Sequence, residues 1–217
     1  APETDPHATQ WLDHGRDCYA GVTFSGLPID DRILIAWMSN WDYARVTPAV
    51  PSRGAMTVAR RLSLTRRADG NIHVRQQPVL PAAVSDDAET FADVELNAAW
   101  PVPVPVPEVA LIELSARFEW AEGFAARIRH GEALHGGVVV RVERGVLMVD
   151  RTQASGDLHP ALASVEVAPL TGDHRVDLRI VLDRSSIEVF ADDGTTVVTD
   201  LIYTDAGENA MTIEPLR

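Results

Sequence analysis

Short apolar runs separated by turn residues recur along the whole chain, and this pattern predicts an all-β protein. The runs are rich in Val, Ile and Leu, and pairs such as Asp69-Gly70 and Arg144-Gly145 stand between them. The runs are CYAGVTF, RILIAWM, GAMTVA, RLSLT, ALIELSARF, GGVVVRV, GVLMVD, VDLRIVLD, SIEVF and TVVTDLIY. Short strands with regular turn signals are typical of a sandwich, a barrel or a propeller.

The C-terminal part predicts a meander of three strands. Its runs are RIVLD, SIEVFAD and TTVVTDLIY, with tight turns at Arg184-Ser185 and Asp193-Gly194. Gly194 follows two Asp residues, which is the chemistry that a hairpin position with positive φ requires. Asp192, Asp193 and Gly194 are therefore interpreted as a turn; the run is too short for a calcium loop.

Three segments interrupt the strand pattern. Residues 78–90 contain Pro78 and Pro81 and few strand formers, so we place a domain boundary there. Residues 100–107, WPVPVPVP, favour polyproline II and cannot form a central strand, and we expect a loop that follows a sheet edge. Residues 119–135 could hold a short helix, although two glycines disfavour it.

Composition and charge exclude several classes of function. The chain has 217 residues, 46% of them hydrophobic, and a net charge of −13. Clustered Lys and Arg carry nucleic-acid affinity and attraction to anionic lipid, so neither a nucleic acid nor a membrane surface is an expected partner. No apolar run approaches the roughly 20 residues of a membrane helix. Residues 1–10 show no signal peptide, and the lone Cys18 fits a reduced cytosol or a disulfide-free secreted protein equally well.

Candidate chemistry is concentrated in the N-terminal third, where aromatic side chains alternate with carboxylates and amides. The residues are Trp11, Asp13, Asp17, Tyr19, Trp37, Asn40, Trp41, Asp42 and Tyr43. Such a surface suits sugars, whose C–H faces stack on aromatic rings, but composition alone favours core packing of Trp and Tyr. Cys18 is interpreted as a small hydrophobe, and the histidines show no metal-ligand spacing, so neither a metal nor another cofactor is expected.

Longer motifs change this interpretation. The runs WLDHGRDCYAGVTF (11–24), ILIAWMSNWDYA (33–44) and PSRGAMTVARRLSL (51–64) resemble glycoside hydrolase family 32, the family of invertases, levanases and exo-inulinases. Residues 145–160 and 178–203 are similar to the C-terminal β-sandwich of that family. The resemblance covers nearly the whole chain in unbroken order.

The resemblance implies a five-bladed β-propeller followed by a β-sandwich. Residues 1–80 would be the last blade and residues 85–217 the sandwich. Family members are retaining glycosidases with a nucleophile and a general acid/base on either side of the scissile bond. The family motifs that carry these groups, "NDPNG", "RDP" and "EC", are absent here, so no catalytic residue is assigned to this chain.

The resemblance also implies three substrate-binding residues, namely Asp17, Tyr19 and Trp41. Tyr19 matches the tyrosine of the family's "DFYA" run, and Asp17 matches its aspartate. Trp41 matches the second tryptophan of "WMSNW" and is expected as the platform under the terminal fructosyl unit, whereas Trp37 is expected to pack inside the blade. Departures from the family pattern include Cys18 for Phe, Ser52 for Trp, and Ala59 and Arg61 for the Pro and Glu of "PREL".

The implied function is that of the C-terminal part of an enzyme that cleaves terminal β-fructofuranosyl units from levan, inulin or sucrose, inactive without the upstream blades. The alternative is a non-catalytic carbohydrate-binding or structural module. The resemblance further implies a secreted bacterial protein.

The residues of the run from Ile33 to Met38 are apolar at odd and even positions alike, so neither face of this strand suits water. We therefore expect a cover over the blade, either an upstream propeller segment present as a separate chain or a second copy of this chain.

Overall fold

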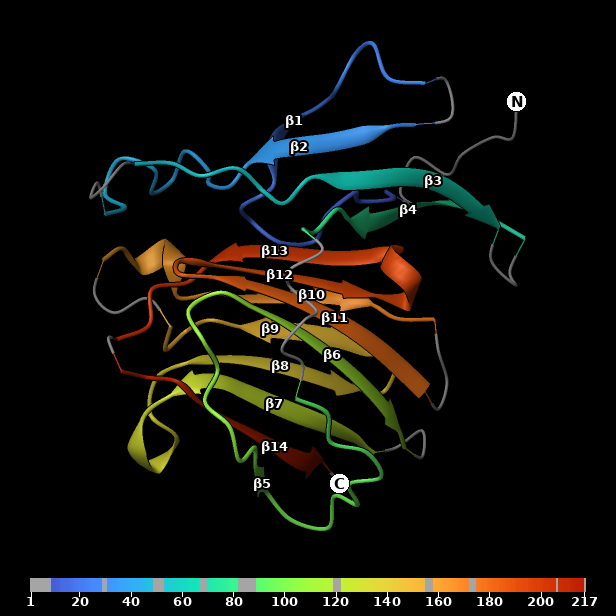
Figure 1. Cartoon of the computed structure of the whole chain (residues 1–217). Helices are drawn as coiled ribbons and strands as arrows, with labels where there is room; N and C mark the ends of the chain where they lie inside the picture. The colour runs from blue at the N-terminus through green and yellow to red at the C-terminus, as the bar shows by residue number, and fades with distance from the viewer. Residues whose placement is uncertain are drawn as a thin grey trace.

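The computed structural model describes residues 9–28, 31–48, 53–66, 70–81, 89–118, 122–154, 158–171, 175–205 and 207–216. These residues form three antiparallel sheets, with three single-turn 3-10 helices and no α-helix among them (Figure 1). The predicted all-β fold is confirmed. In the same described ranges, no helix is long and apolar enough to cross a membrane.

The first sheet contains β1 (Tyr19–Thr23), β2 (Ile33–Trp37), β3 (Arg60–Arg66) and β4 (Ile72–Pro78). The four strands are adjacent in chain order and antiparallel, which is the arrangement within one propeller blade. We call this sheet, with the segments that precede β1 and follow β2, the blade. Only a single bridge, between Trp37 and Met56, forms in the run GAMTVA, where a full strand was predicted.

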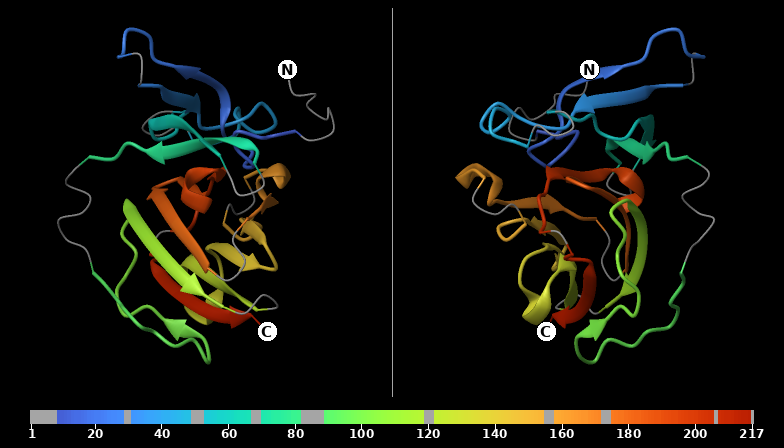
Figure 2. Two further views of the ribbon diagram at one scale, coloured as in Figure 1. Left: turned by 90° about the vertical axis from the view of Figure 1, so that its right-hand side faces the viewer. Right: turned by 60° about the vertical axis from the view of Figure 1, so that its left-hand side comes forward.

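The other two sheets pack face to face as a sandwich (Figure 2). The six-stranded sheet has the order β10-β9-β8-β7-β14-β5, and the four-stranded sheet has the order β13-β12-β11-β6. The strands are β5 (Trp100–Pro101), β6 (Ala110–Arg117), β7 (Gly123–His130), β8 (Val138–Glu143), β9 (Val146–Asp150), β10 (Val165–Pro169), β11 (Arg175–Asp183), β12 (Ser186–Ala191), β13 (Thr196–Leu201) and β14 (Ala210–Leu216). The 3-10 helices are η2 (Glu132–Leu134), η3 (Pro160–Leu162) and η4 (Asp192–Gly194).

Alternation along the strands explains which faces meet. In β11, Val176, Leu178, Ile180 and Leu182 point into the sandwich core, while the residues between them are exposed or half-buried. By contrast, every residue of β12 and β13 is buried. One face of these two strands lies on the sandwich core, and the blade covers the other face, as the blue and teal strands above β13 show in Figure 1. The predicted meander from Arg179 to Tyr203 is confirmed by the β11-β12-β13 order.

The two remaining irregular segments gave different outcomes. The possible short helix in residues 119–135 is found only as the single 3-10 turn η2 at Glu132–Leu134, whereas residues 123–130 form β7 between β8 and β14. Phe124, Ala126 and Ile128 fill the core there, so tertiary pairing decides the conformation. Residues 100–107 run along the edge of the six-stranded sheet as predicted, with Trp100 and Pro101 forming the two-residue edge strand β5 beside β14. The backbone N–H groups of Val102 and Val106 donate to the carbonyls of Met211 and Asn209, at 2.9 and 2.7 Å.

Candidate functional site

Three aromatic side chains meet on one end of the blade. Tyr19 begins β1 and faces Trp37, the last residue of β2, across the strand pair. The ring centroids of Tyr19 and Trp37 lie 6.0 Å apart, and those of Trp37 and Trp41 lie 5.0 Å apart, both in edge-to-face geometry. Tyr19 is 47% exposed and Trp41 67%, while Trp37 between them is half-buried. We call these three residues the aromatic cluster; it offers ring faces on which the C–H groups of a sugar can stack.

The segment that carries Trp41 is fixed by polar contacts on either side of it. The backbone N–H of Asp42 donates to Asn40 Oδ1 at 3.0 Å, and Arg16 Nη2 donates to Asp42 Oδ2 at 2.7 Å. Asn40 Nδ2 donates to Asp17 Oδ1 at 3.0 Å. Arg16 also reaches the carbonyl of Ala161 on the sandwich, at 3.2 Å. The exposed indole of Trp41 therefore stands on an anchored turn.

Asp17, the third residue predicted to bind substrate, does not lie on this surface. Its side chain is completely buried, and both of its carboxylate oxygens accept hydrogen bonds. The donors are Tyr43 Oη (2.6 and 2.7 Å), Arg151 Nη1 (2.8 Å), Leu201 N (2.8 Å) and Asn40 Nδ2 (3.0 Å). With its lone pairs occupied, this carboxylate joins the blade to the sandwich.

The partner of Asp17 could not be predicted from the sequence, because Arg151 lies 134 residues away. Arg151 follows β9 in the sandwich and is fully buried, and its guanidinium lies 5.5 Å from the centre of the Tyr43 ring. Asp200 of β13 completes the group. Asp200 Oδ1 accepts from the backbone N–H of Arg16 at 3.1 Å and lies 3.6 Å from Arg151 Nη2. Asp200 Oδ2 is buried with no hydrogen-bond partner in the described part of the chain.

Burial dominates the acidity of Asp200. It raises the pKa of the Asp200 carboxyl well above its usual range; Arg151 opposes the shift, and the nearby Asp17 and Glu166 carboxylates add to it. A single guanidinium thus faces more than one carboxyl group, and burial of Asp200 disfavours its charged form.

A second buried arginine runs in the opposite direction, from the blade into the sandwich. Arg60 of β3 is fully buried and donates to Asp13 Oδ2 at 2.8 Å and to Glu188 Oε2 of β12 at 2.6 Å. It also donates to Gln76 Oε1 at 3.0 Å and to Thr199 Oγ1 at 2.6 Å. Its guanidinium lies 5.2 Å from the centre of the Phe190 ring. The run quoted for residues 51–64 contains Arg60, but nothing in the sequence indicated this role.

Backbone contacts complete the joint between blade and sandwich. The N–H groups of His14 and Asp17 donate to the carbonyls of Val197 and Thr199, at 2.8 and 3.0 Å, so residues 14–17 cover the free edge of β13. Gly15 makes this approach possible, because a Cβ there would lie 2.1 Å from the Thr199 carbonyl oxygen. We call Arg60, Arg151, their partners and this backbone pairing the joint.

Comparison with known families gives two adjacent matches. The model described as "Glycosyl hydrolases family 32 N-terminal domain" matches residues 2–78, and that described as "Glycosyl hydrolases family 32 C terminal" matches residues 107–215. The chain belongs to glycoside hydrolase family 32. The resemblance found in the sequence is confirmed, as is the fold of an N-terminal-domain fragment followed by the C-terminal β-sandwich.

Family 32 relatives are longer than this chain. A levanase from Bacillus subtilis (strain 168) is 33% identical over 219 residues, which cover 96% of this chain and 32% of the levanase. An extracellular exo-inulinase from Aspergillus awamori is 30% identical over 202 residues, covering 89% of this chain and 37% of that protein. The crystal structure of an exo-inulinase from A. awamori superposes with a TM-score of 0.82 at 26% identity, covering 94% of this chain and 41% of that one. The chain thus spans about a third of the curated relatives that it matches.

Within this family 32 fold, both carboxylates nearest the aromatic cluster pair with arginines. Arg151 binds Asp17, and Arg16 binds Asp42. Cys18 is no nucleophile, since burial foremost, together with the carboxylates of Asp13 and Glu188, raises the pKa of its thiol to about 12 despite nearby Arg60. In the described ranges, no group of three or more His, Cys, Asp or Glu side chains could hold a metal ion. What the site presents is a pair of exposed aromatic ring faces.

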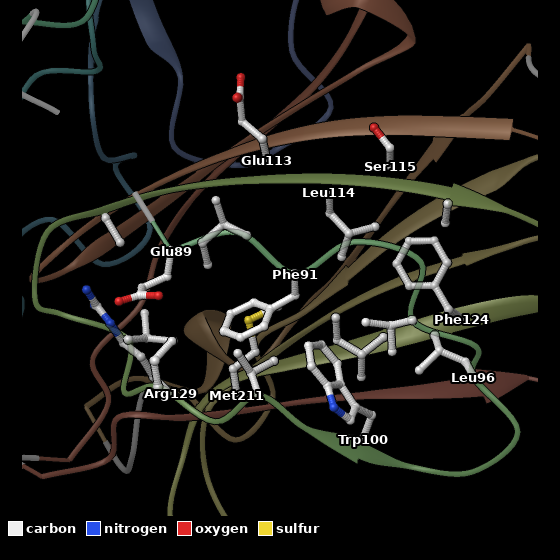
Figure 3. A pocket seen from close by; sticks show the side chains of 18 of the residues that line it. Glu89, Phe91, Leu96, Trp100, Glu113, Leu114, Ser115, Phe124, Arg129 and Met211 are labelled. Atoms are coloured by element: carbon white, nitrogen blue, oxygen red, sulfur yellow. The ribbon is translucent and has the colours of Figure 1, made fainter. Parts of the chain in front are cut away.

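A groove of about 2060 Å³ lies elsewhere, at the open side of the sandwich between β6 and β14. Figure 3 shows Phe91 and Trp100 beside each other in this groove, with Leu114, Phe124 and Met211 also lining it. The rings of Phe91 and Trp100 meet edge to face at 5.5 Å. None of the residues that line the groove belongs to the aromatic cluster.

Proposed function

We propose that this chain is the C-terminal part of a retaining glycosidase that removes terminal β-fructofuranosyl units from levan, inulin or sucrose. In this proposal the aromatic cluster is part of the sugar-binding wall, with Trp41 as the platform and Tyr19 at its side. The observation that carries the proposal is the exposure of both rings on the blade of a family 32 chain, held together by Trp37. Some relatives are extracellular exo-inulinases, which supports a secreted protein.

Catalysis then needs a second part of the enzyme. A retaining glycosidase places two carboxyl groups about 5–5.5 Å apart across the scissile bond. The two carboxylates beside the aromatic cluster are bound by arginines, so we assign the catalytic pair to an upstream propeller part.

The outer strands of the blade support such a partner. Every residue of β1 is exposed, and apolar side chains such as Val22, Phe24, Met56 and Leu64 face outward. An apolar surface of this kind marks an interaction site. The upstream propeller part is the proposed occupant, and a second copy of this chain is the competing one.

Two assays on pure protein test the proposal. The 217-residue chain alone is expected to release no fructose from levan, inulin or sucrose. A hybrid in which this chain replaces the matching third of the Bacillus subtilis levanase is expected to hydrolyse levan, and the Trp41→Ala hybrid to hydrolyse it poorly. Fructose release by the chain alone, with contamination excluded by mass spectrometry, would contradict the assignment of the catalytic pair. A folded hybrid with no activity would instead favour a non-catalytic module.

A further inference from the structure

The turn that carries Trp41 is held from the side of the sandwich. Met38 and Tyr43, at the two ends of this turn, are buried in one cluster with Leu162 and Leu201 of the sandwich. Tyr43 is 1% exposed, although Trp41 only two residues earlier is 67% exposed. The turn therefore places one ring in the joint and a second ring on the surface.

Arg151 is the group on the sandwich that fixes Tyr43. Its Nε donates to Ser164 Oγ at 2.9 Å and its Nη1 to the Leu201 carbonyl at 2.8 Å, both within the sandwich. The same guanidinium donates to Asp17 Oδ2 at 2.8 Å and to Tyr43 Oη at 3.0 Å, both within the blade. A planar fork of five N–H donors can hold all four acceptors at once, and a lysine ammonium cannot.

Asp17 connects Arg151 to the residues on both sides of Trp41 in the chain. Its carboxylate accepts from Tyr43 Oη on one side of Trp41 in the chain and from Asn40 Nδ2 on the other. Arg151, Asp17 and Tyr43 thus form a chain of hydrogen bonds that ends on both flanks of the exposed indole.

We propose that Arg151 of the β-sandwich is a positioning residue for the sugar platform: through Asp17 and Tyr43 it sets where the Trp41 ring stands relative to Trp37. The expected effect on the binding of fructosyl units rests on the proposed function. The position of the two indoles relative to each other does not depend on it. An aromatic platform that is displaced by about 1 Å stacks less well on a bound sugar. The sandwich therefore contributes to sugar binding without contacting the sugar.

The test uses the 217-residue chain and four variants. Tyr43→Phe keeps the buried ring and removes only the hydroxyl, which donates to Asp17 and accepts from Arg151. Arg151→Lys keeps the charge and removes the fork. Trp41→Ala assigns the spectroscopic signal, and Thr212→Val is the matched control, since it deletes a buried hydroxyl that binds His130 inside the sandwich, 2.9 Å away.

The first readout is the exciton couplet of the two edge-to-face indoles in circular dichroism, measured well below each variant's melting temperature. Trp41→Ala is expected to abolish the couplet. Tyr43→Phe and Arg151→Lys are expected to reduce or reshape it in chains that remain folded, and Thr212→Val is expected to leave it unchanged. A wild-type couplet in folded Tyr43→Phe and Arg151→Lys would overturn the inference, because a purely structural role lowers the melting temperature without moving the indole.

The second readout separates this inference from the proposed function. Saturation-transfer NMR with a short levan oligosaccharide is expected to show contact with the wild type, loss in Trp41→Ala, and binding weaker by on the order of tenfold in Tyr43→Phe. Equal binding by wild type and Trp41→Ala would overturn the proposed platform, while the couplet still decides the role of Arg151. Loss in Trp41→Ala with unchanged binding by Tyr43→Phe and Arg151→Lys would overturn the positioning role.

Discussion

The blade and the sandwich are stabilised in different ways. All buried hydrophobic residues of the main core lie between Val106 and Met211, so the sandwich encloses its own core. Among the described residues, the blade contributes Met38 and Tyr43 to a small cluster shared with the sandwich, and its first strand is exposed throughout. Two buried arginines and the pairing of residues 14–17 with β13 join this sheet to the sandwich. A buried ion pair adds little net stability, because its desolvation offsets the attraction, so the blade is the part to which we assign the proposed partner.

Removing Arg60 is expected to cause the largest loss of stability of the blade relative to the sandwich. Arg60→Met leaves Asp13 and Glu188 buried without their cation, a loss that costs about 3–5 kcal/mol. Urea unfolding followed by tryptophan fluorescence, which reports on the blade through Trp37 and Trp41, is expected to show an early transition. Far-ultraviolet circular dichroism is expected to retain a later transition from the sandwich. Arg179→Met, which breaks an exposed pair with Glu113, is the control and is expected to change the unfolding free energy by less than about 1 kcal/mol.

Gly15 tests the backbone half of the joint. Gly15→Ala places a methyl group against the Thr199 carbonyl, and the shift needed to accommodate it is expected to cost about 1–3 kcal/mol. Gly131→Ala is the matched control, since Gly131 has a negative φ of −89° and a Cβ there would come no closer than 3.4 Å to another atom. Equal melting temperatures for the two variants would show that residues 14–17 do not pack on β13.

Asp200, a buried carboxyl at the joint, is expected to make the stability of the chain depend on pH. Burial raises its pKa in the folded chain, so the folded state binds a proton that the unfolded chain releases above about pH 3.9. Stability from this group is therefore lost as pH rises from that value through the raised pKa. The difference in melting temperature between Asp200→Asn and wild type is expected to shift in favour of the variant as the pH rises. Asp177→Asn is expected to show a weak trend of opposite sign, since a hydrogen bond from Arg175 lowers the pKa of the exposed Asp177.

Trp41→Ala is expected to have the smallest effect on stability and a clear effect on sugar binding. The side chain is mostly exposed, so the melting temperature is expected to stay near the wild-type value. Loss of an aromatic platform is expected to weaken binding by about 1–3 kcal/mol, by analogy with base stacking on aromatic side chains. Calorimetry of the hybrid enzyme measures the melting temperature, and a sugar titration of the same protein measures the affinity. A large drop in melting temperature with unchanged binding would make Trp41 a packing residue.

Local pattern and motif order were enough to predict most of the fold. The β11-β12-β13 meander follows from hydrophobic runs and turn residues, and the edge position of residues 100–107 follows from proline, which cannot donate to a ladder. Within residues 119–135, helix is limited to the turn η2, because residues 123–130 pair with two neighbouring strands and this pairing outweighs local propensity. The boundaries 1–80 and 85–217 stay predictions, and residues 82–88 lie outside the described residues.

The candidate site was predictable only in part. Motif resemblance indicated Tyr19 and Trp41, which the fold brings to either side of Trp37. The resemblance did not indicate that Asp17 is buried, because its partner Arg151 lies on another sheet and one sequence carries no record of such distant pairing. Arg60 was missed for the same reason, since Glu188 lies 128 residues away.

Native-state hydrogen exchange tests the central claim most directly, namely that the sandwich is stable through its own core and the blade through the joint. In the 217-residue chain, amides of β7, β8 and β12 are expected to exchange only through global unfolding. Amides of β1 and β2 are expected to exchange through a separate opening of lower free energy. Equal opening free energies for β2 and β8, with the same dependence on denaturant, would contradict the account.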